Sequence, residues 1–301
     1  MTALVTELER PRRGPATERP PRDWPNREAS RLVTAAGIRW HVQVMGSGPA
    51  VLLLHGTGAA THSWRALAPL LAQNFTVVAP DLPGHGFTGR LPGRASLPAM
   101  AAAVADLLRA LDVAPALAIG HSAGAAILAR MALDRSIAPA ALVSLAGALL
   151  PLGGPVGRLF SPLAGLLALT PLVPRIFAWT ASDDRAVERL IRETGSAIEP
   201  AGMALYARLL RDPGHVGGAL AMMADWNLDA LDRALPSLPV PLVLVVGSRD
   251  RTIPPEQAEA VRRRVPGSRI VRLSGAGHLV HEERPEQVAA LIAELQPGEA
   301  P

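Results

Sequence analysis

Residues 116–126 constrain the fold of this chain more than any other stretch. An apolar run suited to a buried strand ends at Gly120, and a small-residue segment of helical character begins at Ala123. Here Gly120, Ser122 and Gly124 form the pattern G-x-S-x-G, which marks a sharp turn from a strand into a helix. The turn crowds the residues two before and two after the serine, and glycine at both positions relieves the crowding. We therefore predict a strand–turn–helix unit that lifts the Ser122 hydroxyl clear of the backbone, where a base can reach it.

Apolar runs suited to buried strands alternate with helix-like segments over most of the chain. The predicted strands are residues 31–36, 38–45, 50–54, 75–79, 114–119, 140–145, 242–246 and 268–273. The predicted helices between and after them are residues 64–73, 97–111, 122–133, 254–264 and 285–295. This alternation predicts an α/β fold, in which helices cover both faces of a mostly parallel eight-stranded sheet. Within one strand the polar His41 and Gln43 alternate with apolar residues, as expected when one face of a strand meets water.

The alternation is interrupted between residues 146 and 238. Segments of helical composition fill this interval, at residues 158–180, 183–195, 202–211 and 216–235. Prolines divide the interval into short pieces, so the simplest interpretation is a helical lid, residues 149–238. The core then comprises residues 26–148 and 239–296. Residues 1–25 are rich in Arg, Glu and Pro, a composition that predicts a poorly ordered arm.

Residues 159–174 of the predicted lid carry no charged side chain. A membrane-spanning helix needs about 20 apolar residues, and prolines interrupt this stretch, so we expect no transmembrane span. Three interpretations stay open: the lining of an apolar pocket, weak contact with a membrane surface, and ordinary core of the lid.

The composition excludes several classes of function. All 30 basic residues are arginine, and the sequence contains neither lysine nor cysteine. Without lysine there is no complete P-loop and no Schiff-base chemistry, and without cysteine there is no disulfide or thiolate site. The net charge is only +4 and the basic runs are short, which argues against nucleic-acid binding. Because the N-terminus lacks the apolar core of a signal peptide, we expect a cytoplasmic protein, with peripheral membrane contact left open by the charge-free stretch.

No cofactor and no metal is predicted. Gly84, Gly86 and Gly89 match G-x-G-x-x-G, but proline and glycine follow where a dinucleotide site needs a helix. His278 and His281 are three residues apart, a spacing found in metal sites, but they lack a third ligand.

A serine nucleophile needs a histidine base, and that histidine needs a carboxylate to fix its tautomer. Asp250 directly follows the strand at 242–246, and His278 directly follows the strand at 268–273. Because the carboxyl ends of parallel strands meet at one edge of a sheet, both should lie near Ser122. Taken singly, Asp250 could equally well be a turn residue, and His278 could cap the end of the strand. His281 is an alternative candidate for the role of the base. We expect His281 to be solvated at the start of the last helix, and the chain order Ser, Asp, His favours Ser122, Asp250 and His278 as catalytic residues.

The negative oxygen formed during acyl transfer needs preorganised hydrogen-bond donors. One predicted donor is the backbone N–H of Ala123, which follows the nucleophile, and the other is the N–H of Thr57 in the loop after strand 50–54. His55 and Gly56 in the same loop are predicted to support it, His55 as a structural hydrogen-bonding residue.

These residues together resemble the α/β-hydrolase superfamily over about residues 30–296. The matching positions are His55 with Gly56, residues 81–86, residues 120–124, Asp250, and Gly277 with His278. A narrower resemblance, carried by residues 23–30, 40–46 and 55–59, is to the magnesium-chelatase accessory hydrolase of bacteriochlorophyll synthesis. The narrower resemblance implies a role near magnesium insertion, contact with magnesium chelatase, and a tetrapyrrole as a possible ligand.

Two hypotheses follow. The first is a cofactor-free serine hydrolase that cleaves an apolar ester, a thioester or an activated C–C bond. The second is a non-catalytic accessory protein or carrier that holds a tetrapyrrole or a chelatase component on the lid. The intact triad favours the first hypothesis, and the narrower resemblance keeps the second open.

Overall fold

The computed structural model describes residues 20–151 and 184–295. The charge-free stretch at 159–174, the predicted helix at 158–180 and the first part of the N-terminal arm lie outside these residues. Within the described part, no helix has both the length and the apolar character to cross a bilayer.

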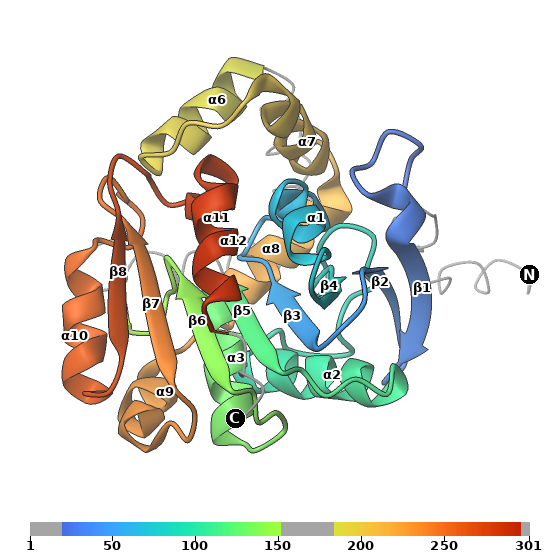
Figure 1. Ribbon diagram of the computed structural model, residues 1–301. Coiled ribbons are helices and arrows are strands. Elements are labelled where there is room, and N and C mark those ends of the chain that lie inside the picture. The colour runs from blue at the N-terminus through green and yellow to red at the C-terminus, as the bar shows by residue number, and fades with distance from the viewer. Residues whose placement is uncertain (1–19, 152–183, 296–301) are drawn as a thin grey trace, which may run out of the picture.

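A single mixed sheet of eight strands forms the centre of the molecule (Figure 1). Its spatial order is β1-β2-β4-β3-β5-β6-β7-β8, and β2 is antiparallel to both of its neighbours while all the other pairs are parallel. The strands are β1 (Ser30–Ala35), β2 (Ile38–Met45), β3 (Ala50–Leu54), β4 (Thr76–Pro80), β5 (Leu117–His121), β6 (Ala141–Leu145), β7 (Leu242–Gly247) and β8 (Arg269–Leu273). The prediction of a mostly parallel eight-stranded sheet is confirmed.

Successive side chains of a strand point to opposite faces, and each face of the sheet has its own apolar core. Leu52 and Leu54 of β3 belong to the core that packs under α2 (Leu97–Ala110), α3 (Ala123–Leu133), α9 (Asp229–Ala234) and α10 (Glu256–Arg264). Val51 and Leu53 belong to the core under α1 (Leu67–Leu71) and α12 (Pro285–Ala293). The cores explain why the central strands read as continuous apolar runs rather than as alternating patterns.

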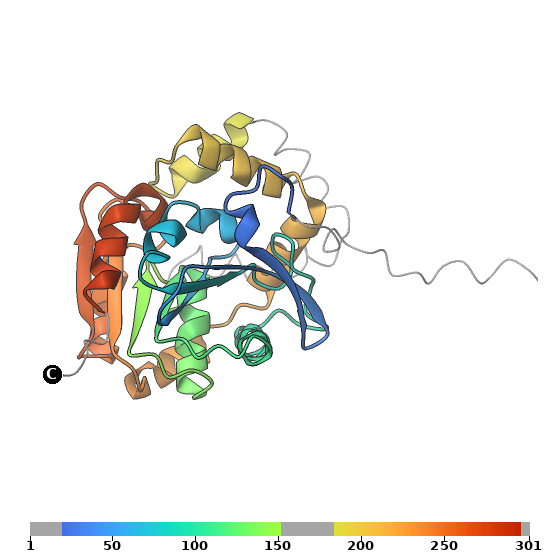
Figure 2. The ribbon, with the colours of Figure 1, turned by 45° about the vertical axis from the view of Figure 1, so that its right-hand side comes forward.

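The chain between β6 and β7 leaves the sheet and supplies α6 (Asp184–Glu193), α7 (Pro200–Leu210) and α8 (Pro213–Ala224) before α9. We call residues 184–228 the insert. Its helices α6 and α7 lie across one end of the sheet (Figure 1), and Figure 2 shows the same arrangement from a second side.

Several local predictions differ from the structure. The helix expected at 64–73 is a 3₁₀ turn, Thr61–Trp64, followed by the short α1, and the segment expected to be helical at 216–235 is divided between α8, α9 and a 3₁₀ turn, Leu235–Ser237. The division occurs because Asn227 Oδ1 accepts the N–H of Asp229 at 2.9 Å and starts α9 anew. The short helix α11 (Val280–Glu283) was not expected.

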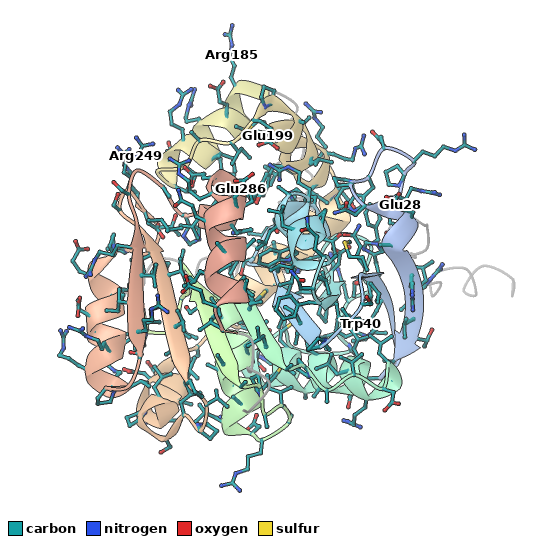
Figure 3. The ribbon with its side chains drawn as sticks, viewed as in Figure 1. Glu28, Trp40, Arg185, Glu199, Arg249 and Glu286 are labelled. Carbon is teal, nitrogen blue, oxygen red and sulfur yellow. The ribbon has the colours of Figure 1, made fainter. Side chains whose placement is uncertain are left out.

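The middle of strand β2, residues 40–43, is buried on both faces, contrary to the prediction from its alternating pattern. His41 and Gln43 are fully buried, like the neighbouring Trp40. Figure 3 labels Trp40 among the side chains of this part of the molecule. His41 Nδ1 lies 2.7 Å from Asp81 Oδ2, and Gln43 Nε2 donates to the carbonyl of Pro25 at 2.7 Å. His41 and Gln43 therefore face other chain segments rather than water.

The last residues of the predicted arm pack on the core. Trp24 is 2% exposed, and its Nε1 donates to Thr61 Oγ1 at 3.1 Å. The prediction of a loose arm is thus wrong for the end of that segment, because the indole of Trp24 finds an apolar site and a hydroxyl acceptor.

Candidate active site

Ser122 occupies the turn between β5 and α3 with φ 50° and ψ −117°. This is a backbone conformation that residues with a Cβ atom rarely adopt. A Cβ atom on Gly120 would lie 2.4 Å from Ala125 N, and one on Gly124 would lie 2.1 Å from Leu54 O. The two glycines of the motif are therefore required by contact with backbone atoms, and the predicted strand–turn–helix unit is present.

Asp250 and His278 meet at the carboxyl ends of β7 and β8. His278 Nδ1 and Asp250 Oδ2 are 2.9 Å apart, and the Asp250 side chain is completely buried. The other carboxylate oxygen of Asp250 accepts the backbone N–H groups of Thr252 at 2.8 Å and Ile253 at 2.9 Å. This arrangement makes Nδ1 of His278 the protonated nitrogen and leaves Nε2 able to accept a proton.

The loop of His278 lies against the turn of Ser122. His121, the residue before the serine, donates from Nε2 to the carbonyl of His278 at 3.1 Å, and the two rings are 4.7 Å apart. Among the described residues no hydrogen bond joins Ser122 Oγ to His278 Nε2. In the absence of substrate such catalytic contacts are often long, so both residues remain candidates for the same site.

His281 is fully buried, contrary to the expectation of a solvated residue. The short helix α11 turns its ring inward, where it lies 4.4 Å from the ring of Trp64 and 4.5 Å from that of His121. Burial holds its pKa well below the ordinary value, and in the described part of the chain neither ring nitrogen has a hydrogen-bond partner. His281 thus lacks the carboxylate that His278 has.

The loop after β3 passes close to the nucleophile candidate. A Cβ atom on Gly56 would lie 2.9 Å from Ser122 Cβ. His55 contacts the carbonyl of Gly56 through Nδ1 at 2.8 Å and accepts the N–H of Leu82 on Nε2 at 2.8 Å, which joins this loop to the next one. Burial, assisted by the nearby His85, lowers the pKa of His55 to about 4, so its ring is neutral at neutral pH.

The two predicted oxyanion donors, Ala123 and Thr57, each follow one of the two residues that approach closely, Ser122 and Gly56. Ala123 is the first residue of α3, so its N–H has no acceptor within the helix. Thr57 follows Gly56, and its hydroxyl donates to Met222 Sδ of α8 at 3.6 Å. The insert therefore covers the loop that contains Thr57.

Two buried polar groups near the site were not predicted as functional or structural centres. Asp81 accepts the N–H groups of Thr61 at 2.6 Å and Phe87 at 2.9 Å. Although burial opposes ionisation, His41 and the N–H of Phe87 hold the pKa of Asp81 well below the usual range. Its place in the motif at 81–86 was the only signal in the sequence.

Glu282 is the second such group. It pairs with Arg65 and accepts the hydroxyl of Tyr206 from α7 at 2.6 Å. Burial raises its pKa to about 7, against the opposing influence of Arg65 and Tyr206. Arg65 also pairs with Glu199, just before α7 (Figure 3). No sequence pattern linked these residues.

A cavity of about 740 Å³ opens between α6 and the loop after β7. It is lined by residues that include Ser196, Arg249 and Pro254, and it reaches the outer side of Asp250 rather than Ser122 or His278. This cavity is therefore not the site in which a substrate would meet the serine.

The comparisons with known proteins agree with this architecture. A family model described as the alpha/beta hydrolase family matches residues 51–291. The chain belongs to the alpha/beta hydrolase family.

This alpha/beta hydrolase is 38% identical over 282 residues to the protein named magnesium-chelatase 30 kDa subunit of Rhodobacter capsulatus; the match covers 92% of this chain and 98% of that protein. Among solved structures it resembles a thermophilic esterase from Thermogutta terrifontis, with a TM-score of 0.69, 26% identity, and coverage of 88% of this chain and 97% of the esterase. An alpha/beta hydrolase fold protein from Burkholderia ambifaria gives a TM-score of 0.71 at 24% identity, with coverage of 88% and 99%, which shows the shared fold alone.

Proposed function

We propose that this protein is a cofactor-free serine hydrolase in which Ser122 is the nucleophile, His278 the general base and Asp250 the residue that orients the base. The observation that carries the proposal is the buried pair of Asp250 and His278, 2.9 Å apart, together with the contact of the His278 loop with the turn of Ser122. The family supports it, since esterases occur among proteins of this fold. The strained backbone of Ser122 supports it as well.

In the proposed reaction, Ser122 Oγ attacks the carbonyl carbon of the substrate while His278 Nε2 takes the hydroxyl proton. The imidazolium is stabilised by the carboxylate of Asp250, and the N–H groups of Ala123 and Thr57 bind the new oxyanion. Collapse of the tetrahedral intermediate expels the leaving group, which takes the proton from His278. A water molecule, deprotonated by His278, then attacks the carbonyl carbon of the acyl-enzyme. The bond from this carbon to Ser122 Oγ breaks, His278 returns the proton to Oγ, and the carboxylic acid product leaves.

We propose an apolar ester-like substrate and a role in bacteriochlorophyll synthesis near magnesium insertion. The support is the 38% identity with the magnesium-chelatase subunit over nearly the full length of both chains. The pathway supplies planar, apolar macrocycles that bear carboxyl groups, and a cytoplasmic protein with peripheral membrane contact would meet them. Arg158 and Arg175, which could meet such carboxyl groups, lie outside the described residues.

The second candidate function is a non-catalytic accessory or tetrapyrrole-binding protein of magnesium chelatase. One observation favours it: the relative is named as a subunit of the chelatase rather than as a hydrolase. In that case the insert would contact the chelatase or hold the macrocycle, and Ser122 would be dispensable.

Labelling with a fluorophosphonate probe tests the nucleophile directly. We expect covalent labelling of the native chain and none of Ser122→Ala, while Ser136→Ala, a change just after the end of α3, should label like the native chain. Equal labelling of the native chain and Ser122→Ala would remove Ser122 from this role.

Complementation separates the two candidate functions. A deletion strain would receive the native chain or Ser122→Ala, and pigment and accumulated precursors would be quantified. Rescue by the native chain alone supports the hydrolase, whereas full rescue by Ser122→Ala supports the accessory function. Normal pigment in the deletion strain would reject the pathway.

A further inference from the structure

The turn that follows α6, residues 194–197, lies directly against the loops of Asp250 and His278. Gly195 has φ +84°, and a Cβ atom there would lie 1.9 Å from the carbonyl oxygen of Arg249. From the other side, a Cβ atom on Gly277 would lie 2.3 Å from the carbonyl carbon of Gly195. The turn and the two loops are thus in backbone-to-backbone contact, with no space for a side chain between them.

Hydrogen bonds join the turn to both loops. Thr194 O accepts the N–H of Arg251, which follows Asp250, at 3.1 Å. Ser196 Oγ accepts the N–H of Leu279, which follows His278, at 2.9 Å. Ser196 is 4% exposed and Leu279 is 5% exposed, so water does not readily replace this bond.

A carboxylate reinforces the second contact. Glu283 Oε1 accepts the N–H of Gly277 at 2.9 Å, and its Oε2 accepts the N–H of Ala197 at 3.3 Å. One carboxylate therefore holds the residue before His278 and the residue after Ser196 together.

The backbone around His278 is consequently fixed at three successive points. Glu283 accepts the N–H of the residue before His278, and His121 donates to the carbonyl oxygen of His278. Ser196 accepts the N–H of the residue after His278. Of these three, Ser196 alone belongs to the insert. With the backbone fixed, two side-chain torsions decide whether the imidazole points from Asp250 toward Ser122, and small displacements of a catalytic group are costly.

We propose that Ser196 is a positioning residue. Through its hydrogen bond with the N–H of Leu279, it makes the orientation of His278 depend on how the insert packs against the loops of Asp250 and His278. The inference rests on the proposed function of His278 as the base. It assigns to the insert a part in the reactivity of the site that is separate from any contact with substrate.

The test compares full-length Ser196→Ala with the native chain and with Ser136→Ala. Ser136 is the control, because its hydroxyl also bonds to a backbone group, the carbonyl of Met131, but it is exposed and follows α3, at the end of that helix away from Ser122. The first readout is the rate constant of fluorophosphonate labelling. The second is the low-field proton resonance of His278 Nδ1–H, which is observed by NMR and assigned by its loss in Asp250→Asn.

We expect Ser196→Ala to label at least about tenfold more slowly and to shift or broaden the low-field resonance, while Ser136→Ala matches the native chain in both. A native labelling rate together with an unmoved resonance in Ser196→Ala would overturn the proposal, even if that variant melts at a lower temperature.

A wrong assignment of the nucleophile and a wrong assignment of Ser196 give different results. A native chain that does not label would reject the proposed nucleophile, while the resonance in Ser196→Ala would still decide whether Ser196 positions His278. If the native chain shows no low-field resonance that Asp250→Asn removes, the pair of Asp250 and His278 is absent in solution and the proposal falls with it.

Discussion

Acidification should destabilise this protein steeply, because most of its histidines are buried in the neutral form. The pKa is lowered in six of the eight, and burial is the largest cause in each: His55, His62, His85, His121, His215 and His281. The pKa of His85 is lowered to about 3, and those of His55 and His215 to about 4. An unfolded chain binds protons at these residues near pH 6.5, whereas the folded chain does not.

The size of the effect follows from proton linkage. Each buried neutral histidine lowers the free energy of unfolding by about 1.4 kcal/mol for each pH unit below 6.5. If all six stay neutral in the folded protein, the loss between pH 7.5 and pH 5.5 is about 8 kcal/mol.

Glu282 opposes this loss. Its pKa is raised to about 7, so the folded protein takes up a proton there before the unfolded chain does, and its free energy of unfolding falls as the pH rises through that range. On acidification from pH 7.5 to 5.5, protonation of Glu282 raises the free energy of unfolding by about 2 kcal/mol. The net loss in the free energy of unfolding is then about 6 kcal/mol. A loss of that size is comparable with the whole stability of many domains, about 5–15 kcal/mol.

Urea unfolding followed by tryptophan fluorescence at pH 7.5 and pH 5.5 measures the difference. The variant His62→Phe removes one of the six buried histidines. Phenylalanine suits this position, because the His62 ring packs edge-on at 4.4 Å from the ring of Tyr206 and, in the described part of the chain, neither of its nitrogens forms a hydrogen bond. This variant should lose about 1.4 kcal/mol less per pH unit than the native chain. Equal free energies of unfolding at the two pH values would show that the buried histidines do not destabilise the protein in acid. The same pH slope in His62→Phe as in the native chain would show that His62 does not contribute.

Three further predictions test separate parts of the structure. Asp250→Asn should lower the catalytic rate by about 10⁴-fold, because an amide favours the wrong tautomer of His278; activity that survives this change and is lost with another carboxylate would show the acid to be misassigned. Glu282→Gln should steepen the loss of stability on acidification, measured by the same urea experiment, and an unchanged slope would mean that Glu282 does not bind the proton. Ser122→Gly should be about 1 kcal/mol more stable than Ser122→Ala in thermal unfolding, because glycine accepts φ 50° without strain; equal stabilities would argue against strain at this turn.

The positions of the strands and of the candidate triad follow from local patterns, which is why they could be predicted. Asp250 follows β7, a strand buried along its whole length that is a continuous apolar run, and His278 follows β8, the partly exposed edge strand. The geometry of a parallel sheet then brings those residues to one edge without any knowledge of side-chain contacts.

Burial of single polar residues could not be predicted in the same way. The alternating pattern of β2 shows which residues share a face, but not that Asp81 and the chain around Pro25 cover the polar one. Likewise Glu282 lies in a strongly polar stretch, and only the fold brings Arg65 and Tyr206 to it from distant parts of the chain. Long-range contacts decided these cases, and a single sequence does not display them.

The conformation of Ser122 bears on the choice between a hydrolase and a carrier. A serine at φ 50° and ψ −117° costs about 1–3 kcal/mol relative to a relaxed backbone, and glycine would remove that cost. A carrier that uses only the insert gains nothing from a strained serine at the edge of the sheet. A hydrolase would gain, because the turn lies against the loop of His278 and would offer both the Ser122 hydroxyl and the N–H of Ala123 to a substrate.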